Sequence, residues 1–294
     1  MRFKQMKALA LGGVLALALT ACGDDASTSG GHVDVSVADN PTFDEGTTMA
    51  KLAAAGKITI GVKIDQPGIG FLQPGDDLPT GFDIEMARVL AAGLGIDDSG
   101  ITWKETISDN REPFLQGGDV DLVLASYSIT DERRAVVGQA GPYYVTGQQL
   151  MVREEDKEKI AGPDDLAGIK VCSVSGSTSL DTAEAKGADP VPLDTYSECV
   201  DQLTNGTVDA VTTDGAILLG YAAEDPDALE VVGEPFSEER YGVGYKLGDS
   251  AMCTYITDTL QEAMDDGTWK KAFEETLGKS GVDTPEPPTM DPCQ

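Results

Sequence analysis

From Met49 onward, the apolar residues follow two alternating patterns, which are helical spacing and short continuous runs. In the first part of the chain this predicts helices over 48–55, 84–94 and 111–117, strands over 57–62, 101–106 and 120–125, and a loop over 65–80. A second unit begins after Met151, with strands over 170–174 and 208–213 and a helix over 216–223. Strand character returns at 241–245, followed by helices over 251–264 and 269–277. This alternation is typical of α/β domains with mostly parallel sheets.

The strand predicted at 120–125 runs directly into ligand-type groups. Hydroxyl side chains follow it at Ser126, Ser128 and Thr130. Thr130 or Asp131 can cap a short helix there, and Arg133 lies one turn into that helix. Small ligands bind at the carboxyl ends of strands in open α/β sheets, and a guanidinium matches a carboxylate with two parallel hydrogen bonds. Arg133 is therefore a candidate carboxylate ligand, and the competing interpretation is a solvated surface charge.

The second unit repeats this arrangement. Its strand at 170–174 runs into the sequence SGSTS, so backbone amides and hydroxyls gather at a helix N-terminus around Ser177 and Thr178. Such a terminus favours an anion, although the same sequence is also a good strand-to-helix turn. The strand at 208–213 ends at Asp214, which either receives an ammonium group or caps the next helix. The pattern alone favours the cap.

The N-terminal residues have the pattern of an export signal. Three basic residues precede an apolar run over 8–19, which is too short for a permanent membrane helix. Small residues precede Cys22, as in a bacterial lipobox, so we expect residues 1–21 to be a lipoprotein signal peptide and Cys22 to be lipidated. The alternative is an ordinary signal with a chance cysteine. The polar stretch 22–48 is then expected to be a flexible tether.

The charge balance limits the partners of the chain. Removal of residues 1–21 leaves 18 basic against 51 acidic residues, a net charge of −33. A chain so acidic, without a basic stripe or polybasic patch, is not expected to bind nucleic acid. Attachment to a membrane would have to come from the lipid. We therefore expect an exported protein held on the outer face of the cell membrane by Cys22.

Four cysteines follow Cys22, and an even number in an exported chain favours two disulfides. Their positions favour the pairing Cys172–Cys199 with Cys253–Cys293 among three possible pairings. A metal site is the weaker interpretation, because there is no Cys-x-x-Cys spacing and the one histidine, His32, lies in the expected tether. No metal and no cofactor are expected.

Several segments together resemble the extracellular solute-binding proteins that deliver polar amino acids to ABC importers. They are GVKIDQPGIGF at 61–71, TGFDIEMARVLAAGLG at 80–95, DVDLVLASYSITDERR at 119–134, GPYYVTGQQLMV at 141–152, VCSVSGSTS at 171–179, VDAVTTDGAILLGY at 208–221 and AMDDGTWKKAF at 263–273. The opening at 41–63 is similar to that of lipid-anchored glutamate-binding proteins of Gram-positive actinobacteria. The resemblance implies a two-lobed periplasmic-binding-protein-like (type II) α/β fold, in which two open sheets are joined by a two-stranded hinge. It assigns 49–147 plus 243–294 to lobe 1 and 148–242 to lobe 2.

The resemblance also assigns roles to single residues. Arg133 matches the arginine that binds the ligand α-carboxylate, with Ser126 and Ser128 beside it. Thr178, after Ser177, matches a second-lobe position that meets the same carboxylate, and Asp214 matches the acid that receives the ammonium group. Arg111, in the NREP motif at 110–113, and Lys63 match cations seen where the ligand side chain is acidic.

Aromatic residues that stack on basic or apolar ligands in other members are replaced here by Gly68 and Ser108, which leaves Phe71 and Tyr127 as nearby aromatic candidates. The alternative role for Arg111 is a surface ion pair with Glu112 or Asp109.

The expected function is the capture of glutamate, or aspartate, for an ABC importer whose permease and ATPase are separate chains. The chain itself is expected to be a monomer that closes over its ligand. The alternatives are a binder of glutamine, asparagine or another polar amino acid, and a ligand-sensing module for a membrane receptor. An enzyme is not expected, because the only imidazole lies in the expected tether and no phosphate-binding loop is present.

Overall fold

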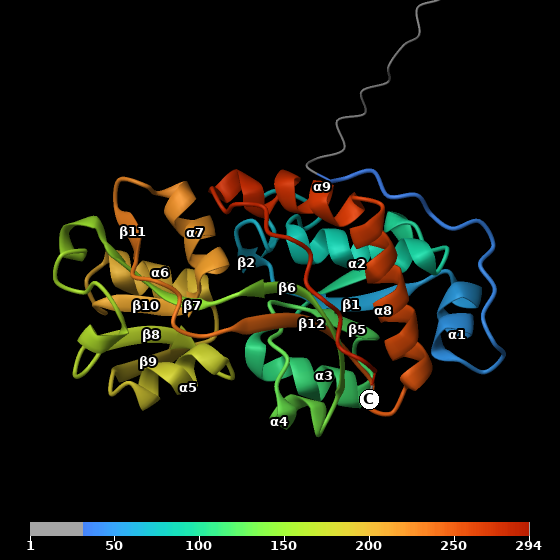
Figure 1. The fold of residues 1–294 in the computed structure, drawn as a ribbon, viewed down its shortest axis with the longest axis horizontal. Helices are drawn as coiled ribbons and strands as arrows, with labels where there is room; N and C mark the ends of the chain where they lie inside the picture. Colours follow the sequence, from blue (N-terminus) through green and yellow to red (C-terminus); the bar gives the residue numbers. More distant parts are fainter. Residues whose placement is uncertain (1–31, 294) are drawn as a thin grey trace, which may run out of the picture. The chain divides into compact units, whose positions relative to one another are not determined.

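The computed structural model describes residues 32–293. The expected signal peptide and the expected lipidation site, Cys22, lie outside the described residues. Two five-stranded mixed sheets form the centres of two lobes (Figure 1). Lobe 1 is the part of the chain around the sheet with strand order β4-β1-β5-β12-β6, and lobe 2 is the part around the sheet with order β11-β7-β10-β8-β9.

The sheet of lobe 1 has four strands that run in one direction and a fifth, β12, that runs in the opposite direction. Its strands are β1 (Ile58–Val62), β4 (Ile101–Glu105), β5 (Leu122–Leu124), β6 (Gly138–Thr146) and β12 (Glu239–Tyr245). Its α-helices are α1 (Thr48–Ala55), α2 (Phe82–Gly93), α3 (Arg111–Gly117), α4 (Asp131–Arg134), α8 (Ser250–Asp265) and α9 (Thr268–Glu275). A short hairpin, β2 (Asp65–Gln66) and β3 (Gly70–Phe71), follows β1, and 3-10 helices lie at η1 (Asp98–Gly100), η2 (Ser108–Asn110) and η5 (Leu277–Ser280). β1 is parallel to β4 and β5, whereas β12 is antiparallel to β5 and β6.

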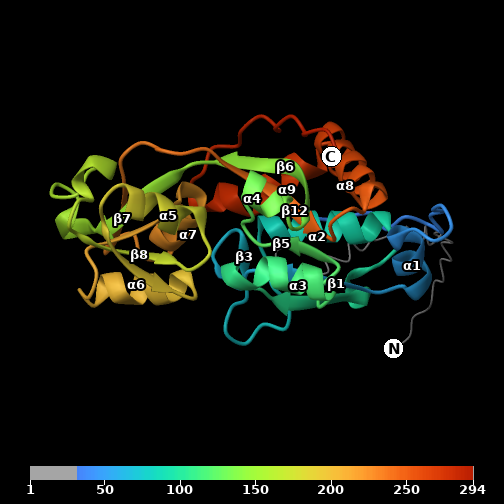
Figure 2. The ribbon, with the colours of Figure 1, turned by 90° about the horizontal axis from the view of Figure 1, so that it is seen from below.

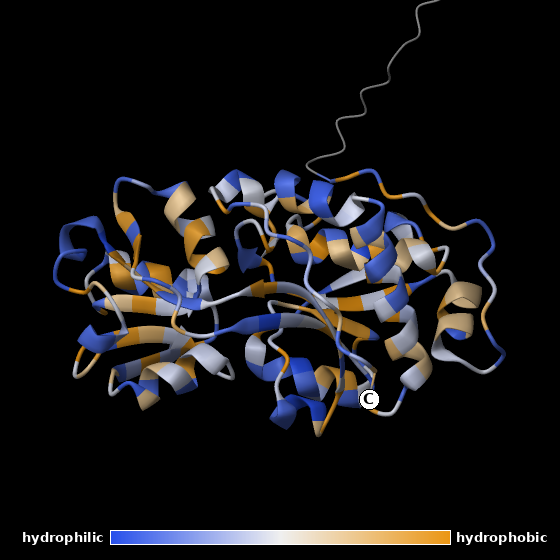
Figure 3. Cartoon of the chain, viewed as in Figure 1, coloured by the Kyte–Doolittle hydropathy of each residue, from blue (hydrophilic) through white to orange (hydrophobic). Residues whose placement is uncertain are grey.

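Lobe 2 repeats the mixed arrangement. Its strands are β7 (Gln148–Arg153), β8 (Lys170–Val174), β9 (Asp189–Leu193), β10 (Ala210–Asp214) and β11 (Leu229–Val232). Its helices are α5 (Thr178–Ala185), α6 (Tyr196–Thr204) and α7 (Gly215–Glu224), with 3-10 helices η3 (Glu154–Asp156) and η4 (Pro163–Asp165). β8 is parallel to β9 and β10, and β7 is antiparallel to β10 and β11. In Figure 3 apolar and polar residues alternate along the helices of both lobes, as expected where one face of a helix is buried.

The chain passes between the lobes twice. It leaves lobe 1 through β6 into β7 and returns from β11 into β12, and β6 and β12 pair through Tyr144↔Tyr241 and Thr146↔Glu239. In Figure 2 the last helix pair, α8 and α9, lies on the lobe 1 side with α2, while α5, α6 and α7 lie on the lobe 2 side. Trp269 of α9 donates its indole N–H to the carbonyl of Tyr143 at 2.8 Å. Residues after β12 therefore complete the core of lobe 1.

The cysteines pair as Cys172–Cys199 and Cys253–Cys293, the pairing that their order along the chain favoured. The first disulfide joins β8 to α6 inside lobe 2, and the second joins α8 to the C-terminal segment. Each therefore ties together parts of one lobe and leaves the passage between lobes unconstrained.

The structure differs from the sequence analysis in two places. The segment 65–80 was expected to be a loop but contains the β2–β3 hairpin. Residues from His32 on were assigned to a flexible tether but pack on α2, because Val33 is buried and the buried Glu85 accepts hydrogen bonds from the Val33 N–H at 3.2 Å and binds His32 Nδ1 at 2.5 Å. Apolar burial and a buried carboxylate thus hold a segment whose composition indicated a linker.

Candidate functional site

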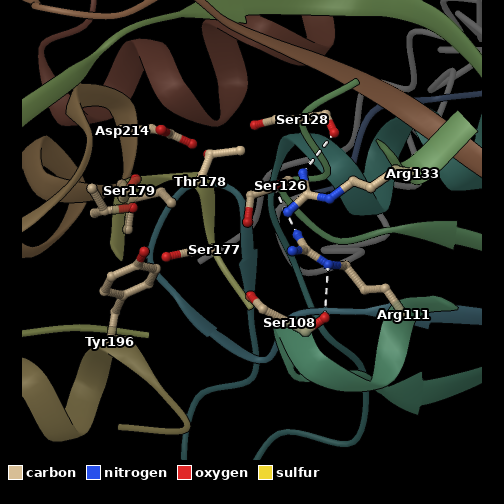
Figure 4. A pocket seen from close by; sticks show the side chains of 12 residues that line it. Ser108, Arg111, Ser126, Ser128, Arg133, Ser177, Thr178, Ser179, Tyr196 and Asp214 are labelled. Carbon is tan, nitrogen blue, oxygen red and sulfur yellow. Dashed lines mark hydrogen bonds between the residues drawn. The ribbon is translucent and has the colours of Figure 1, made fainter. Parts of the chain in front are cut away.

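A small cavity lies where the carboxyl ends of strands from both lobes meet. It is lined by Ser108, Arg111, Ser126, Ser128, Arg133, Ser177, Thr178, Ser179, Tyr196, Thr213, Asp214 and Ile217 (Figure 4). Every predicted ligand residue except Lys63 is among them. The lining is dominated by hydroxyl and charged groups, so the cavity is suited to a small polar ligand.

Arg111 begins α3 and is only 2% exposed. Its Nε donates to the carbonyl of Ser108 at 3.1 Å, and one terminal nitrogen donates to the carbonyls of Ala125 and Ser126, both at 3.3 Å. The other terminal nitrogen donates to the carbonyl of Gly176 in lobe 2 at 3.0 Å. These four bonds fix the orientation of the Arg111 guanidinium group in the cavity lining.

Arg133 lies beside Arg111, and the two guanidinium groups face the same part of the cavity (Figure 4). One terminal nitrogen of Arg133 donates to the carbonyl of Ser128 at 2.7 Å, and the other donates to the carbonyl of Gly176 at 3.0 Å. Both guanidinium carbons lie over the ring of Tyr127, at 4.5 Å for Arg111 and 5.1 Å for Arg133. The aromatic face and the hydroxyl of Tyr127, which donates to Glu112 at 2.7 Å, support the pair from behind.

The three cations of the lobe 1 site differ in their partners, because Arg133 pairs with Glu112 at 3.4 Å and the other two lie within the range of the buried Asp83 without bonding to it. Within residues 32–293, neither Arg111 nor Lys63 forms an ion pair, although Lys63 is only 3% exposed. Burial and then the charge of Arg111 lower the pKa of Lys63 to about 7, and burial and then Arg133 lower the pKa of Arg111 to about 10. The expected alternative for Arg111, a surface ion pair with Glu112 or Asp109, is wrong. Its side chain is buried instead of lying on the surface.

Lys63 lies one layer behind the cavity. Its Nζ donates to the hydroxyl of Ser108 at 3.0 Å, and Ser108 lines the cavity. Lys63 therefore reaches the site through that hydroxyl, which it orients.

The strand end at β5 is held in an unusual conformation. Ser126 has a positive φ of 42°, and its backbone N–H donates to Asp83 at 2.7 Å. Asp83 also accepts from the hydroxyl of Tyr143 at 2.6 Å, and burial raises its pKa to about 6. This anchor turns the chain after β5 so that Ser126 and Ser128 both line the cavity.

Asp214 ends β10 and is the negative group of the cavity. Its Oδ2 accepts a hydrogen bond from the hydroxyl of Tyr241 at 2.6 Å, while Oδ1 is buried with no partner among the described residues. The side chain makes no cap bond to α7, so the helix-cap interpretation is wrong. Burial, and then the neighbouring Glu239, raise the pKa of Asp214 to about 7. A buried carboxylate oxygen without a donor is an available acceptor for a cationic ligand group.

The start of α5 forms the opposite wall. The Ser177 hydroxyl accepts from the N–H of Leu180 at 3.0 Å and so caps the helix, while the Thr178 hydroxyl donates to Glu239 at 3.0 Å. Since both hydroxyls are engaged, the helix N-terminus with its backbone amides is what this wall offers to an anion.

Five lining residues were not predicted as ligands. They are Ser108, Ser179, Tyr196, Thr213 and Ile217. Tyr196 begins α6, and the sequence around it indicates only a capped helix, so no local signal distinguishes it. The two aromatic candidates do not line the cavity. Tyr127 supports the guanidinium groups, and Phe71 lines a separate groove.

The described residues provide neither a membrane-spanning helix nor a metal-binding cluster. Within residues 32–293 no helix is both long and apolar enough to cross a membrane. The same residues contain no group of three or more histidine, cysteine or acidic side chains that could hold a metal ion.

Comparison with known families and proteins agrees with this geometry. The family described as bacterial extracellular solute-binding proteins, family 3, matches residues 58–279. A glutamate-binding protein GluB of Corynebacterium glutamicum is 37% identical over 288 residues, which cover 94% of this chain and 90% of that protein. An ABC transporter glutamine-binding protein GlnH of Bacillus subtilis is 34% identical over 233 residues, covering 78% of this chain and 84% of that protein.

A solved structure shares the fold. An ancestral arginine-binding protein bound to glutamine superposes with a TM-score of 0.71 at 34% identity and covers 76% of this chain and 98% of that one. The expected fold class, two open α/β sheets in two lobes joined by a two-stranded hinge, is confirmed.

Proposed function

The chain belongs to the bacterial extracellular solute-binding proteins, family 3, and we propose that the amino acid it captures is acidic, with glutamate as the first candidate and aspartate as the second. The observation that carries this proposal is a pair of buried cations in lobe 1, Lys63 and Arg111, that form no salt bridge among the described residues. Arg133 can serve the α-carboxylate that every amino acid has, but Lys63 and Arg111 remain as buried cations without an ion pair among the described residues. Burying an unpaired charge is costly, and a second carboxylate on the ligand would offset that cost.

Each charged group of the ligand then has a partner in the cavity. Arg133 and the N-terminus of α5 bind the α-carboxylate, with the hydroxyls of Ser126 and Ser128 beside them. The free Oδ1 of Asp214 accepts from the ammonium group. The side-chain carboxylate meets Arg111 and the hydroxyl of Ser108, which Lys63 holds.

Binding would proceed by closure. Residues from both lobes line the cavity, so a ligand that contacts both stabilises the closed arrangement by the contacts it makes only there. The β6–β12 pair is the hinge in this proposal. The closed protein would then deliver the amino acid to an importer whose permease and ATPase are other chains. In this proposal a lipid on Cys22 holds the protein at the membrane, and the chain is a binder and not an enzyme.

A glutamine binder is the second candidate. Arg111 already donates to four backbone carbonyls, so it could serve as a structural cation, and the relative from Bacillus subtilis is named for glutamine. The two candidates differ in what Arg111 contributes to binding.

Calorimetry on the exported domain separates them. Arg111→Ala should weaken glutamate by about 2–5 kcal/mol, because its side-chain carboxylate is left desolvated and unpaired, while glutamine loses much less. Arg134→Ala is the matched control, since Arg134 pairs with Asp291 and does not line the cavity. A folded Arg111→Ala variant that holds glutamate as tightly as the parent would overturn the acidic-ligand proposal in favour of the second candidate.

A further inference from the structure

The β2–β3 hairpin is built into lobe 1. Its backbone accepts bonds from the start of α2, with Phe82 N–H to the carbonyl of Gly68 and Asp83 N–H to the carbonyl of Ile69, both at 2.9 Å. The hairpin therefore moves with lobe 1.

The same hairpin contacts two helices of lobe 2. One oxygen of the Asp65 carboxylate accepts from the backbone N–H of Tyr196 at 2.9 Å and of Ser197 at 3.4 Å, at the start of α6. The hydroxyl of Tyr221 in α7 donates to the backbone carbonyl of Asp65. At Gly220 a β-carbon would lie 2.3 Å from the carbonyl oxygen of Pro67, so α7 is packed against the hairpin as closely as a glycine allows.

The cap of α6 is thereby divided between the lobes. Inside lobe 2, Thr195 accepts from the N–H of Glu198 at 3.3 Å, and the Glu198 carboxylate accepts from the N–H of Thr195 at 3.2 Å. This capping box leaves the first two helical amides, those of Tyr196 and Ser197, without a partner from their own lobe. Asp65 supplies an acceptor, and a negative charge, at the positive end of the helix. When the lobes separate, those two amides return to water.

The divided cap adjoins the binding cavity. Tyr196 is the first residue of α6, lines the cavity and is buried. Its hydroxyl lies 3.4 Å from the hydroxyl of Ser173 in β8. The backbone that Asp65 holds thus carries a side chain that walls the site.

We propose that Asp65 is a positioning residue, which completes the cap of α6 only when the lobes close and so holds Tyr196 and lobe 2 over the bound amino acid. This rests on the proposed function only in that the cavity binds an amino acid, and not in which one. A contact present only in the closed arrangement shifts the closing equilibrium, so its loss weakens every ligand by the same factor. That uniformity separates it from Arg111, whose loss is expected to discriminate between ligands.

The test uses calorimetry and stopped-flow dissociation with each amino acid that the parent binds. Asp65→Ala should raise Kd about tenfold for all of them, because loss of a helix cap typically costs about 1 kcal/mol or somewhat more, and the change should lie in faster dissociation. Asp65→Asn keeps an acceptor and should restore part of the affinity. Tyr221→Phe removes the second bond without altering charge and should raise Kd roughly threefold. Asp77→Ala, an exposed acid of the same connection, is the matched control and should leave Kd unchanged.

Small-angle scattering on the same variants provides a readout that does not depend on ligand identity. With saturating ligand, the parent should compact, and Asp65→Ala should compact less or require more ligand to do so. Unchanged Kd values and unchanged compaction in folded Asp65→Ala and Tyr221→Phe variants would overturn the proposal. So would a loss confined to acidic ligands, which would make Asp65 an electrostatic neighbour of Lys63 instead. If the parent protein preferred a neutral amino acid, the proposed function would fail. The equal increase in Kd that Asp65→Ala is expected to cause for all ligands could still be measured.

Discussion

The two lobes bring opposite charges to the same cavity. Lobe 1 contributes the cations, Arg111 and Arg133 in the lining and Lys63 behind them, whereas lobe 2 contributes the carboxylate of Asp214. Burial shifts the two kinds of group in opposite directions, lowering the pKa of Lys63 to about 7 and raising that of Asp214 to about 7. Among the described residues, Lys63 and Arg111 of lobe 1 and the carboxylate of Asp214 in lobe 2 thus each lack an oppositely charged partner in an ion pair. A ligand that carries both charges supplies a partner to both lobes at once. Under the proposed function, this division between lobes would select for zwitterions, in a chain whose overall charge is −30.

The largest effect is expected from removing the cation that all amino acids share. Arg133→Ala should cost about 3–5 kcal/mol in binding free energy for glutamate and glutamine alike, since the α-carboxylate then lacks its guanidinium partner. Calorimetry with both ligands measures this. A variant that lost glutamate but kept glutamine would show that Arg133 and Arg111 have exchanged the roles assigned to them.

The second largest effect is expected from removing the negative charge that lobe 2 contributes to the cavity, the carboxylate of Asp214. Asp214→Asn should weaken glutamate by about 2–4 kcal/mol, because the ammonium group loses its buried carboxylate. Glutarate, which lacks the ammonium group, provides the control. The parent should discriminate strongly between glutamate and glutarate, and the variant should discriminate far less. Equal discrimination by both proteins would place the ammonium elsewhere.

The pH dependence of ligand affinity should report the titration of Asp214 in lobe 2 and of Lys63 in lobe 1 separately. Below pH about 7, protonation of Asp214 should weaken glutamate and glutamine alike. Above pH about 7, deprotonation of Lys63 should weaken glutamate only, by up to tenfold per pH unit in the limit. Calorimetry between pH 6 and 8.5 should therefore give a bell-shaped affinity for glutamate and a rising one for glutamine. Lys63→Met should remove the alkaline limb, and a limb that persisted would have to come from another group.

The smallest effect is expected at Glu239, which bonds Thr178 and adds negative charge near Asp214. Glu239→Gln keeps a hydrogen-bonding group but removes the charge, so the pKa of Asp214 should fall and the acid limb should move to lower pH. At neutral pH the change in affinity should stay within about 1 kcal/mol. An acid limb that did not move would assign the raised pKa of Asp214 to burial alone.

The local pattern of apolar and polar residues was enough to predict the site candidates that lie at strand ends. The apolar runs predicted β5, β8 and β10, and because polar groups at the carboxyl ends of such strands converge, the same pattern predicted Ser126 and Ser128 as site candidates. The role of Asp214 was not predictable from the pattern, since the helix cap is a local alternative and the hydroxyl of Tyr241 arrives from a distant strand. Tyr196 was missed for the same reason, because the residues that it meets in the cavity are distant in the sequence and come from both lobes. The sequence around His32 indicated a linker, since a buried Glu85 that would hold it cannot be inferred from composition.

The carbonyl of Gly176, which accepts bonds from both arginines, lies where the lobes touch. Its residue has φ of 72°, and a β-carbon there would lie 2.2 Å from Oδ1 of Asp109 in lobe 1. The backbone nitrogen of Asp109 would lie 3.1 Å away, so a methyl group at this point would crowd the contact between the lobes as well as strain the backbone. A Gly176→Ala variant would therefore disfavour the closed arrangement of the lobes. It would provide the reference state against which the free energy of closure is measured.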